Sequence, residues 1–286
     1  MIKFLEAVMK FVFFLCTLTS IVAVLMICIF LFQSGIPAIN EIGLFNFLGG
    51  QDWLPSNSPP SYGIFPMIIG SIYITIGAII VGVPTGLLTA IFLAWYCPDW
   101  LYKFIKPAIN LLAGIPSIVY GFFGLVVLVP FVRENFEGTG SSVFTASIIL
   151  GIMILPTIIG VSETAIKAVP ASYYEGASAL GANKERSIFL CVLPAAKSGI
   201  IASIVLGIGR AIGETMAVVL ICGNQAWVPD SIFKGVRTLT ANIVLEMGYA
   251  TGLHRDALIA TGVVLFIFIL IINLTFAFLK RRAENK

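Results

Sequence analysis

Charged residues are scarce in this chain of 286 residues. They make up 11% of it, whereas soluble domains average about 25%, and 59% of the residues are hydrophobic. The mean hydropathy is +1.03. This composition excludes an ordinary soluble domain. It predicts a polytopic membrane protein whose parts outside the membrane are too short to fold as domains.

The residues that usually build a catalytic or metal site are also missing. His254 is the only histidine, so no histidine cluster can bind a metal or relay protons. No Ser-His-Asp arrangement is available. A Walker A loop needs Gly-x-x-x-x-Gly-Lys-Ser/Thr, and the nearest approach, Lys197-Ser198, is preceded by Ala196. We therefore expect no enzyme activity, metal, cofactor or nucleic acid partner, and energy must come from another chain.

The cysteines show no Cys-x-x-Cys or Cys/His spacing. We expect buried free thiols rather than disulfides or metal ligands. The five positions are Cys16, Cys28, Cys97, Cys191 and Cys222.

Long apolar runs dominate what is present. About 20 apolar residues cross a bilayer as a helix, and six runs meet this length. They cover residues 11–32, 66–95, 111–132, 143–161, 199–221 and 257–279. The first exceeds the core of a signal peptide, about 7–15 residues, so we expect an uncleaved helix. The fold class is therefore an all-α membrane protein with six transmembrane helices, the second of them tilted or bent at Gly82-Val83-Pro84.

Lysine and arginine predict the orientation, because they concentrate in cytoplasmic segments. With the N-terminus in the cytoplasm, twelve basic residues lie inside, four lie outside and Arg210 lies within a span, which accounts for all 17. The outside four are Arg133, Lys234, Arg237 and Arg255. Both termini are then expected in the cytoplasm of a bacterial inner membrane.

Two external segments are sizeable. Residues 33–63 have no basic residue, and with Trp53, Pro55, Pro59 and Pro60 they are expected to form an ordered cap on the membrane surface. Residues 223–256 contain TLTANIVLEM at 238–247, closed by Gly248. That run predicts a short helix, either dipping partway into the membrane or lying in an ordinary loop.

The longest polar interruption, YEGASALGANKERSIFLCVLP, covers residues 174–194 and falls on the cytoplasmic side. Ser172 and Glu175 have the spacing of a capping box. Gly181 stands where a left-handed helix C-cap is expected. The sequence therefore predicts a short helix, a glycine turn and a second short helix before the fifth span.

This pattern resembles the EAA loop of importer-type ABC permeases, with Glu175, then Gly181, and Pro194 thirteen residues later. In that family the loop docks into a cleft on the ATPase, so we call residues 174–194 the coupling segment. The alternative is a plain amphipathic linker. Gly176 departs from the alanine that the family usually has, which weakens the first helix. The resemblance assigns ATPase coupling to Glu175, Gly176, Ala177, Leu180, Gly181, Arg186 and Pro194.

Arg210 and Glu214 are the only ionisable residues deep in a predicted span. Four residues apart, they share one face of a continuous helix, and we expect Glu214 to pair with Arg210. An arginine in the membrane is costly unless paired or facing a polar cavity, and its planar fork matches phosphate oxygens. The pair thus indicates either an anion path or a structural ion pair.

Three stretches together resemble the PstC-type permeases of bacterial phosphate importers. They are LLAGIPSIVYGFFGLVVLVP at 111–130, GRAIGETMAV at 209–218 and RTLTANIVLEMGY at 237–249. The resemblance implies a type I importer permease for inorganic phosphate. It implies a PstA-type second permease forming a heterodimer, an ATPase dimer and an extracytoplasmic phosphate-binding protein. The expected path residues are Arg210, Glu214, Thr215, Ser117, Arg237 and Thr238.

The expected organisation is an N-terminal helix with its external loop (1–65), a permease core (66–280) whose coupling loop covers about 172–197, and a cytoplasmic tail (281–286). Other functions stay open: a sulfate or molybdate permease, a stand-alone ion-coupled transporter with Glu214 as proton carrier, and a non-transporting sensor of phosphate status.

Overall fold

Helices account for nearly all of the regular structure, as the long apolar runs predicted. The computed structural model describes residues 2–284. Among those residues, five helices are long and apolar enough to cross a membrane, or six if the bent pair 184–195 and 197–213 counts as one span. The all-α prediction is confirmed, with one two-stranded hairpin added. The longer helices are α1 (Ile2–Ile42), α3 (Phe65–Ile91), α4 (Asp99–Gly114), α7 (Val143–Lys167), α11 (Lys197–Gly213) and α14 (Leu253–Glu284).

The shorter elements connect these helices or cover their ends. They are α2 (Leu44–Gly49), β1 (Trp53–Leu54), β2 (Ser61–Tyr62), α5 (Ser117–Phe123), α6 (Val129–Asn135), α8 (Ala171–Ala179), α9 (Lys184–Ser187), α10 (Leu193–Ala195), α12 (Met216–Ile221) and α13 (Leu239–Glu246). Three π-helical segments complete them: η1 (Phe92–Tyr96), η2 (Gly124–Leu128) and η3 (Ile188–Val192).

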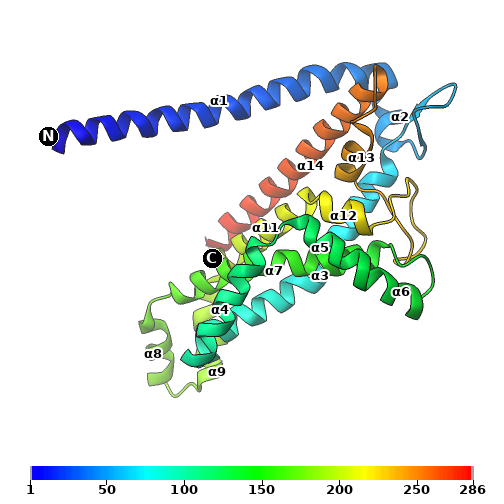
Figure 1. Cartoon of the computed structure of the whole chain (residues 1–286). Helices are drawn as coiled ribbons and strands as arrows, with labels where there is room; N and C mark the ends of the chain where they lie inside the picture. The colour runs from blue at the N-terminus through cyan, green and yellow to red at the C-terminus, as the bar shows by residue number, and fades with distance from the viewer. Residues whose placement is uncertain (1, 285–286) are drawn as a thin grey trace.

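The centre of the bundle is α7, which packs against α3 and α11 (Figure 1). Glycines on α3 permit the close approach. A Cβ on Gly77 would lie 2.1 Å from the Ser147 hydroxyl oxygen, and one on Gly82 would lie 2.7 Å from Ile154. Small residues at a helix interface allow this packing in membranes, where no hydrophobic effect drives helices together.

The first and last spans are longer than predicted. The first runs on through Pro37 to Ile42, because its last turns pack against α14. A Cβ on Gly35 would lie 2.6 Å from Val263. The other end of α1 extends away from the bundle (Figure 1). Helix α14 continues through residues 281–284 of the expected tail, and residues 285–286 lie outside the described residues.

The predicted third span, 111–132, is divided. Residues 111–114 close α4, and a new helix begins at Ser117. Ile115 has φ −71° and ψ 126°, an extended conformation. The cause is Pro116, whose ring disfavours helical geometry in the residue before it.

The predicted fifth span, 199–221, is also broken. Helix α11 ends at Gly213, Glu214 is extended with ψ 133°, and α12 starts at Met216. The 17-residue α11 and the 6-residue α12 therefore meet end to end inside the predicted membrane region. The broken helix places backbone and side-chain polar groups at a depth where a continuous helix would offer none.

Each π-helical segment ends next to a proline. The amides of Cys97, Val129 and Leu193 donate to carbonyls five residues earlier, and Pro98, Pro130 and Pro194 follow directly. A proline ring clashes with the carbonyl four residues before it. At η2 and η3 the wider π turn accommodates that ring and the helix continues into α6 and α10, whereas at η1 Cys97 is extended with ψ 123° and the helix ends. Such turns often mark functional positions.

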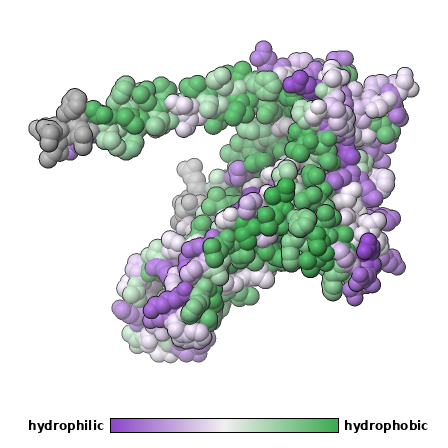
Figure 2. Space-filling model, in the orientation of Figure 1, coloured by the Kyte–Doolittle hydropathy of each residue, from purple (hydrophilic) through white to green (hydrophobic). Residues whose placement is uncertain are grey.

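Polar surface gathers at the two ends of the molecule. In Figure 2 hydrophilic residues cover the end with α8 and α9 and the opposite end with α2 and the neighbouring loops, and hydrophobic surface lies between them. At the loop end, α2 and the antiparallel hairpin β1–β2, residues 44–62, pack on α13 and α14 through Phe47 and Trp53. We call residues 44–62 the cap.

Candidate functional site

The coupling segment forms the predicted helix, glycine turn and second helix. Gly181 has φ +87°, which confirms the left-handed position. Its amide donates to the Ser178 carbonyl at 2.9 Å, and the Ala182 amide donates to the Ala177 carbonyl at 3.1 Å. These two bonds make a Schellman motif, in which glycine avoids the penalty that a Cβ would bring.

The start of this segment differs from the predicted capping box. Pro170, not Ser172, is the N-cap of α8, and no side chain caps that helix. The side-chain cap lies instead at α9, where Asn183 Oδ1 accepts from the Arg186 amide at 2.9 Å. The helix begins at Ala171, directly after Pro170, so Ser172 lies inside its first turn, where its backbone is helical and its hydroxyl cannot act as the N-cap.

The proposed coupling residues lie mostly on the surface. Leu180, an apolar residue, is 91% exposed, and Ala177 is the one that is half-buried. Exposed members are Glu175, Gly176, Leu180, Gly181, Arg186 and Pro194.

Arg210 and Glu214 do not form the predicted ion pair. Arg210 Nη1 donates to the Thr157 hydroxyl on α7 at 3.4 Å, a long contact. Glu214 Oε1 accepts from the Ala217 amide at 3.2 Å, at the start of α12. The physical reason is the helix break, which sends the two side chains to different helix ends.

Each charge instead complements a helix terminus. Arg210 is in the last turn of α11, where the helix dipole is negative, and Glu214 precedes α12, where it is positive. Among the described residues, no carboxylate lies within ion-pair distance of Arg210. The half-buried guanidinium therefore keeps hydrogen-bond donors for a ligand.

The break also meets α13. The Thr240 hydroxyl donates to the Glu214 carbonyl at 3.0 Å and lies 3.0 Å from the Thr238 hydroxyl, which caps α13. The Thr215 hydroxyl donates to the Gly213 carbonyl at 3.3 Å, and the Thr215 carbonyl accepts from the Val219 amide at 2.9 Å. Ser117 is the first residue of α5 and is half-buried. Of the predicted path residues, Glu214 and Thr238 are thus joined through Thr240, which the sequence did not single out.

Arg237 belongs to a different cluster, nearer the cap. Its Nη1 bonds Glu246 at 2.6 Å and the Asn242 side-chain oxygen at 3.0 Å. Glu246 also accepts from Trp53 Nε1 at 2.9 Å and lies 2.8 Å from His254 Nε2. The sequence reasoning missed this cluster, because its members are spread from residue 53 to residue 254.

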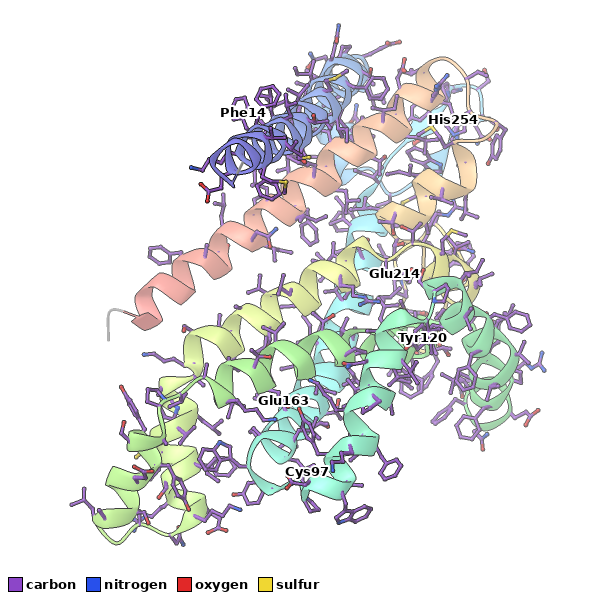
Figure 3. The ribbon with its side chains drawn as sticks, turned by 60° about the vertical axis from the view of Figure 1, so that its left-hand side comes forward. Phe14, Cys97, Tyr120, Glu163, Glu214 and His254 are labelled. Carbon is purple, nitrogen blue, oxygen red and sulfur yellow. The ribbon has the colours of Figure 1, made fainter. Side chains whose placement is uncertain are left out.

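A second missed cluster surrounds Glu163 on α7, which is 2% exposed. Its carboxylate accepts from the Tyr102 hydroxyl at 2.7 Å, Lys106 at 2.6 Å and Lys167 at 2.7 Å. Only the Glu163–Lys167 spacing of four was readable from the sequence. Figure 3 shows Glu163 toward the α8 end, His254 toward the cap, and Glu214 with Tyr120 between them.

The five cysteines are free thiols, as expected. Only Cys222 is buried, and Cys16 is exposed on the part of α1 that extends from the bundle. The expectation of burial was therefore wrong for the other four cysteines, Cys16, Cys28, Cys97 and Cys191. The reason is that the outer faces of the helices, and of α1 above all, are not covered by other parts of this chain.

Known proteins resemble this chain closely. The family model of the binding-protein-dependent transport system inner membrane component matches residues 82–285. A probable ABC transporter permease protein, YqgH of Bacillus subtilis (strain 168), is 40% identical over 267 residues, covering 90% of this chain and 86% of that protein. The phosphate transport system permease protein PstC of Pasteurella multocida (strain Pm70) is 36% identical over 262 residues, covering 85% and 81%.

Solved transporter structures share the fold. A chain of the bacterial alginate ABC transporter, crystallised with its alginate-bound periplasmic protein, superposes with a TM-score of 0.65 at 17% identity and covers 94% of each chain. A chain of the inward-facing MetNI methionine ABC transporter gives 0.58 at 21% identity, covering 77% of this chain and 94% of that one.

A binding-protein-dependent ABC transporter comprises a substrate-binding protein, a partner permease and an ATPase, and its permease component lacks ATPase activity of its own. These matches agree with the helical fold and with the exposed coupling segment. The chain belongs to the family of inner-membrane permease components of binding-protein-dependent transport systems, as a multi-pass protein with the type I importer fold.

Proposed function

We propose that this permease moves inorganic phosphate into the cell as the PstC-type subunit of its importer. The observation that carries the proposal is Arg210, a half-buried guanidinium at a helix break, with one long hydroxyl contact and no carboxylate partner among the described residues. Relatives named PstC support phosphate as the anion. The relative at 40% identity carries no substrate in its name.

The chemistry favours an oxyanion. A guanidinium binds phosphate oxygens through two parallel hydrogen bonds, and the bonds strengthen away from water. The hydroxyl of Thr157 and the broken backbone at Glu214 add neutral polar groups beside it. Because Glu214 bonds the α12 amide, it lowers the positive potential at the site without occupying the guanidinium.

The partners follow from the same proposal. A PstA-type permease would complete a heterodimer, an ATPase dimer would receive the coupling segment, and a phosphate-binding protein would deliver the anion on the cap side. Both termini would then lie in the cytoplasm. The organisation into an N-terminal part (1–65), a core (66–280) and a tail (281–286) is kept as a proposal.

The test is uptake of labelled phosphate in a strain without its own importer, with membrane levels matched by immunoblot. Arg210→Gln should lower uptake about 10–100-fold. This is the factor in rate that corresponds to losing one charge-assisted hydrogen bond. Arg255→Gln is the matched control, because Arg255 is exposed near the start of α14, and its uptake should be unchanged. Wild-type uptake by Arg210→Gln would overturn the role of Arg210.

Substitutions at Glu214 provide a second, independent test in the same uptake assay. Glu214→Gln keeps an oxygen that can accept from the Ala217 amide and should retain most uptake, whereas Glu214→Leu removes the acceptor and should not. If Glu214→Gln were as inactive as Glu214→Leu, the carboxylate charge itself would be needed, as a proton carrier or counter-charge.

Competition separates the anions. Excess unlabelled phosphate should suppress uptake, and equal sulfate or molybdate should not. Suppression by sulfate or molybdate alone would assign the permease to those oxyanions. A complex that binds its partners but moves no anion in reconstituted vesicles would indicate a sensor.

A further inference from the structure

Helix α8 is loosely attached to the rest of the permease. It has no buried residue, and only Tyr174 and Ala177, three apart on one face, are half-buried. Any displacement that a docked ATPase imposes on α8 must therefore pass through its chain connections or through the few side chains on that face. Tyr174 is the only large side chain among them.

Two contacts run from the coupling segment to the same short element. The Tyr174 ring packs against the Trp95 ring with centroids 4.8 Å apart and planes tilted by 32°. The Lys184 ammonium lies 4.6 Å from the centroid of the Tyr96 ring. Tyr174 is on α8 and Lys184 is on α9, so the helices on both sides of Gly181 hold neighbouring residues of η1.

Segment η1 is suited to pass on a displacement. It joins the end of α3 to α4 through Cys97-Pro98, and the Cys97 amide donates to the Phe92 carbonyl at 2.8 Å. Around it, Trp95 and Tyr96 pack on a buried apolar cluster that contains Ile91 and Ile188. Single π turns within helices are rare and are frequent at functional sites.

Helix α4 connects η1 to the region of Arg210. Near the α8 end it is held by the Glu163 carboxylate through Tyr102 and Lys106. In its last turn, the Leu112 carbonyl accepts from the Tyr120 hydroxyl at 2.8 Å. Tyr120 is buried in the same cluster as Ala211 and Ala217, which flank the break between α11 and α12.

We propose that η1 is the receiving element of the coupling segment, with Trp95 and Tyr96 as positioning residues that transfer its displacement to α3 and α4. Tyr174 and Lys184 are the matching residues on the segment. This inference rests on the proposed function, because it needs an ATPase docked at residues 174–194. The contacts with η1 provide a second route by which a displacement of the coupling segment reaches the break between α11 and α12. This route is separate from the chain connections to α7 and α11.

The first experiment measures phosphate moved per ATP hydrolysed by the complete transporter in vesicles. Trp95→Leu and Tyr174→Leu keep apolar bulk and should leave ATPase activity within about 2-fold of wild type, while phosphate per ATP falls about 10-fold. Trp95→Phe keeps a ring and should restore at least half of the ratio. Trp100→Leu is the matched control, since Trp100 is 65% exposed on α4, and its ratio should be unchanged.

A merely structural contact would give a different result. Trp95→Leu would then lower the amount of assembled complex, with transport and ATPase activity falling together at an unchanged ratio, and the proposal would be wrong. An inactive wild-type complex would instead be a failure of the proposed substrate, so the two failures are distinguishable.

The second experiment needs no substrate. With the other tryptophans of the complex replaced by phenylalanine, ATP binding should shift the emission of Trp95, and Tyr174→Leu should abolish the shift. An emission that ATP leaves unchanged in the complex with Tyr174 intact would overturn the proposal, whichever anion the permease carries.

Discussion

At the residue scale, Gly181 forms the turn between α8 and α9. Its φ of +87° is unfavourable for a residue with a Cβ, yet no atom lies within 4 Å of where that Cβ would stand. Substitution therefore costs backbone energy alone, about 1–2 kcal/mol. The turn would shift rather than clash.

We expect Gly181→Val to insert in the membrane at normal levels and to lose ATPase-driven transport. The physical reason is the changed direction of the chain between α8 and α9. Binding of the ATPase, measured by co-purification, and phosphate uptake check it together. Normal uptake at equal expression would contradict the docking role.

Gly176→Ala is the control on the same helix. Gly176 has no positive φ, and nothing lies within 4 Å of its added Cβ. Alanine should stabilise α8 locally, by about 0.8–1 kcal/mol on the helix propensity scale. Its uptake should match or exceed that of the wild type.

At the scale of elements, Glu163 ties α4 to α7. It is the one acceptor shared by Tyr102, Lys106 and Lys167, and Lys167 also lies 4.2 Å from the Tyr102 ring. Besides these bonds, α4 contacts the bundle through a small apolar cluster around Ile109 and through Leu112, which packs on the central core and whose carbonyl accepts from Tyr120. The Glu163 carboxylate holds the first half of α4 to α7.

Glu163→Gln should lower the thermal unfolding temperature of the purified protein by several degrees. The amide loses the charge-assisted bonds to two lysines, which are worth about 1–3 kcal/mol after allowance for their partial exposure. Asp230→Asn is the control. Its bond to Lys234 lowers the pKa of the Asp230 carboxyl, but both side chains are exposed, so no change is expected. An equal shift for both variants would show that Glu163 has no special role.

At the scale of the whole molecule, the two polar ends are expected on opposite sides of the membrane. Asn57 lies in the cap, between β1 and β2, and Lys184 begins α9 at the other end. The apolar belt of Figure 2 separates them.

Single cysteines at Asn57 and Lys184, in a background without the five native ones, should react with a membrane-impermeant thiol reagent from opposite sides. Asn57→Cys should be labelled in intact cells, and Lys184→Cys only in inverted vesicles. Labelling of both in intact cells would overturn the orientation, although the fold would stand.

The sequence by itself determined whatever depends on neighbours along the chain. Long apolar runs specify helices that cross a bilayer, a glycine after a short helix specifies a left-handed cap, and the balance of basic residues predicts which end faces inward. These inferences succeeded for the α-helical fold and the turn at Gly181 because each rests on local chemistry.

The tertiary structure decided where helices stop and which charges meet. Arg210 and Glu214 have the spacing of an ion pair along one helix. Because the helix breaks at Glu214, Arg210 lies at the end of α11 and Glu214 accepts from an amide at the start of α12. Glu163 has a donor on α4 and Glu246 has one on β1, both far away in sequence. Spacing along one helix gives no information on these contacts, because a buried carboxylate is satisfied by whichever donors the packing of other helices brings near.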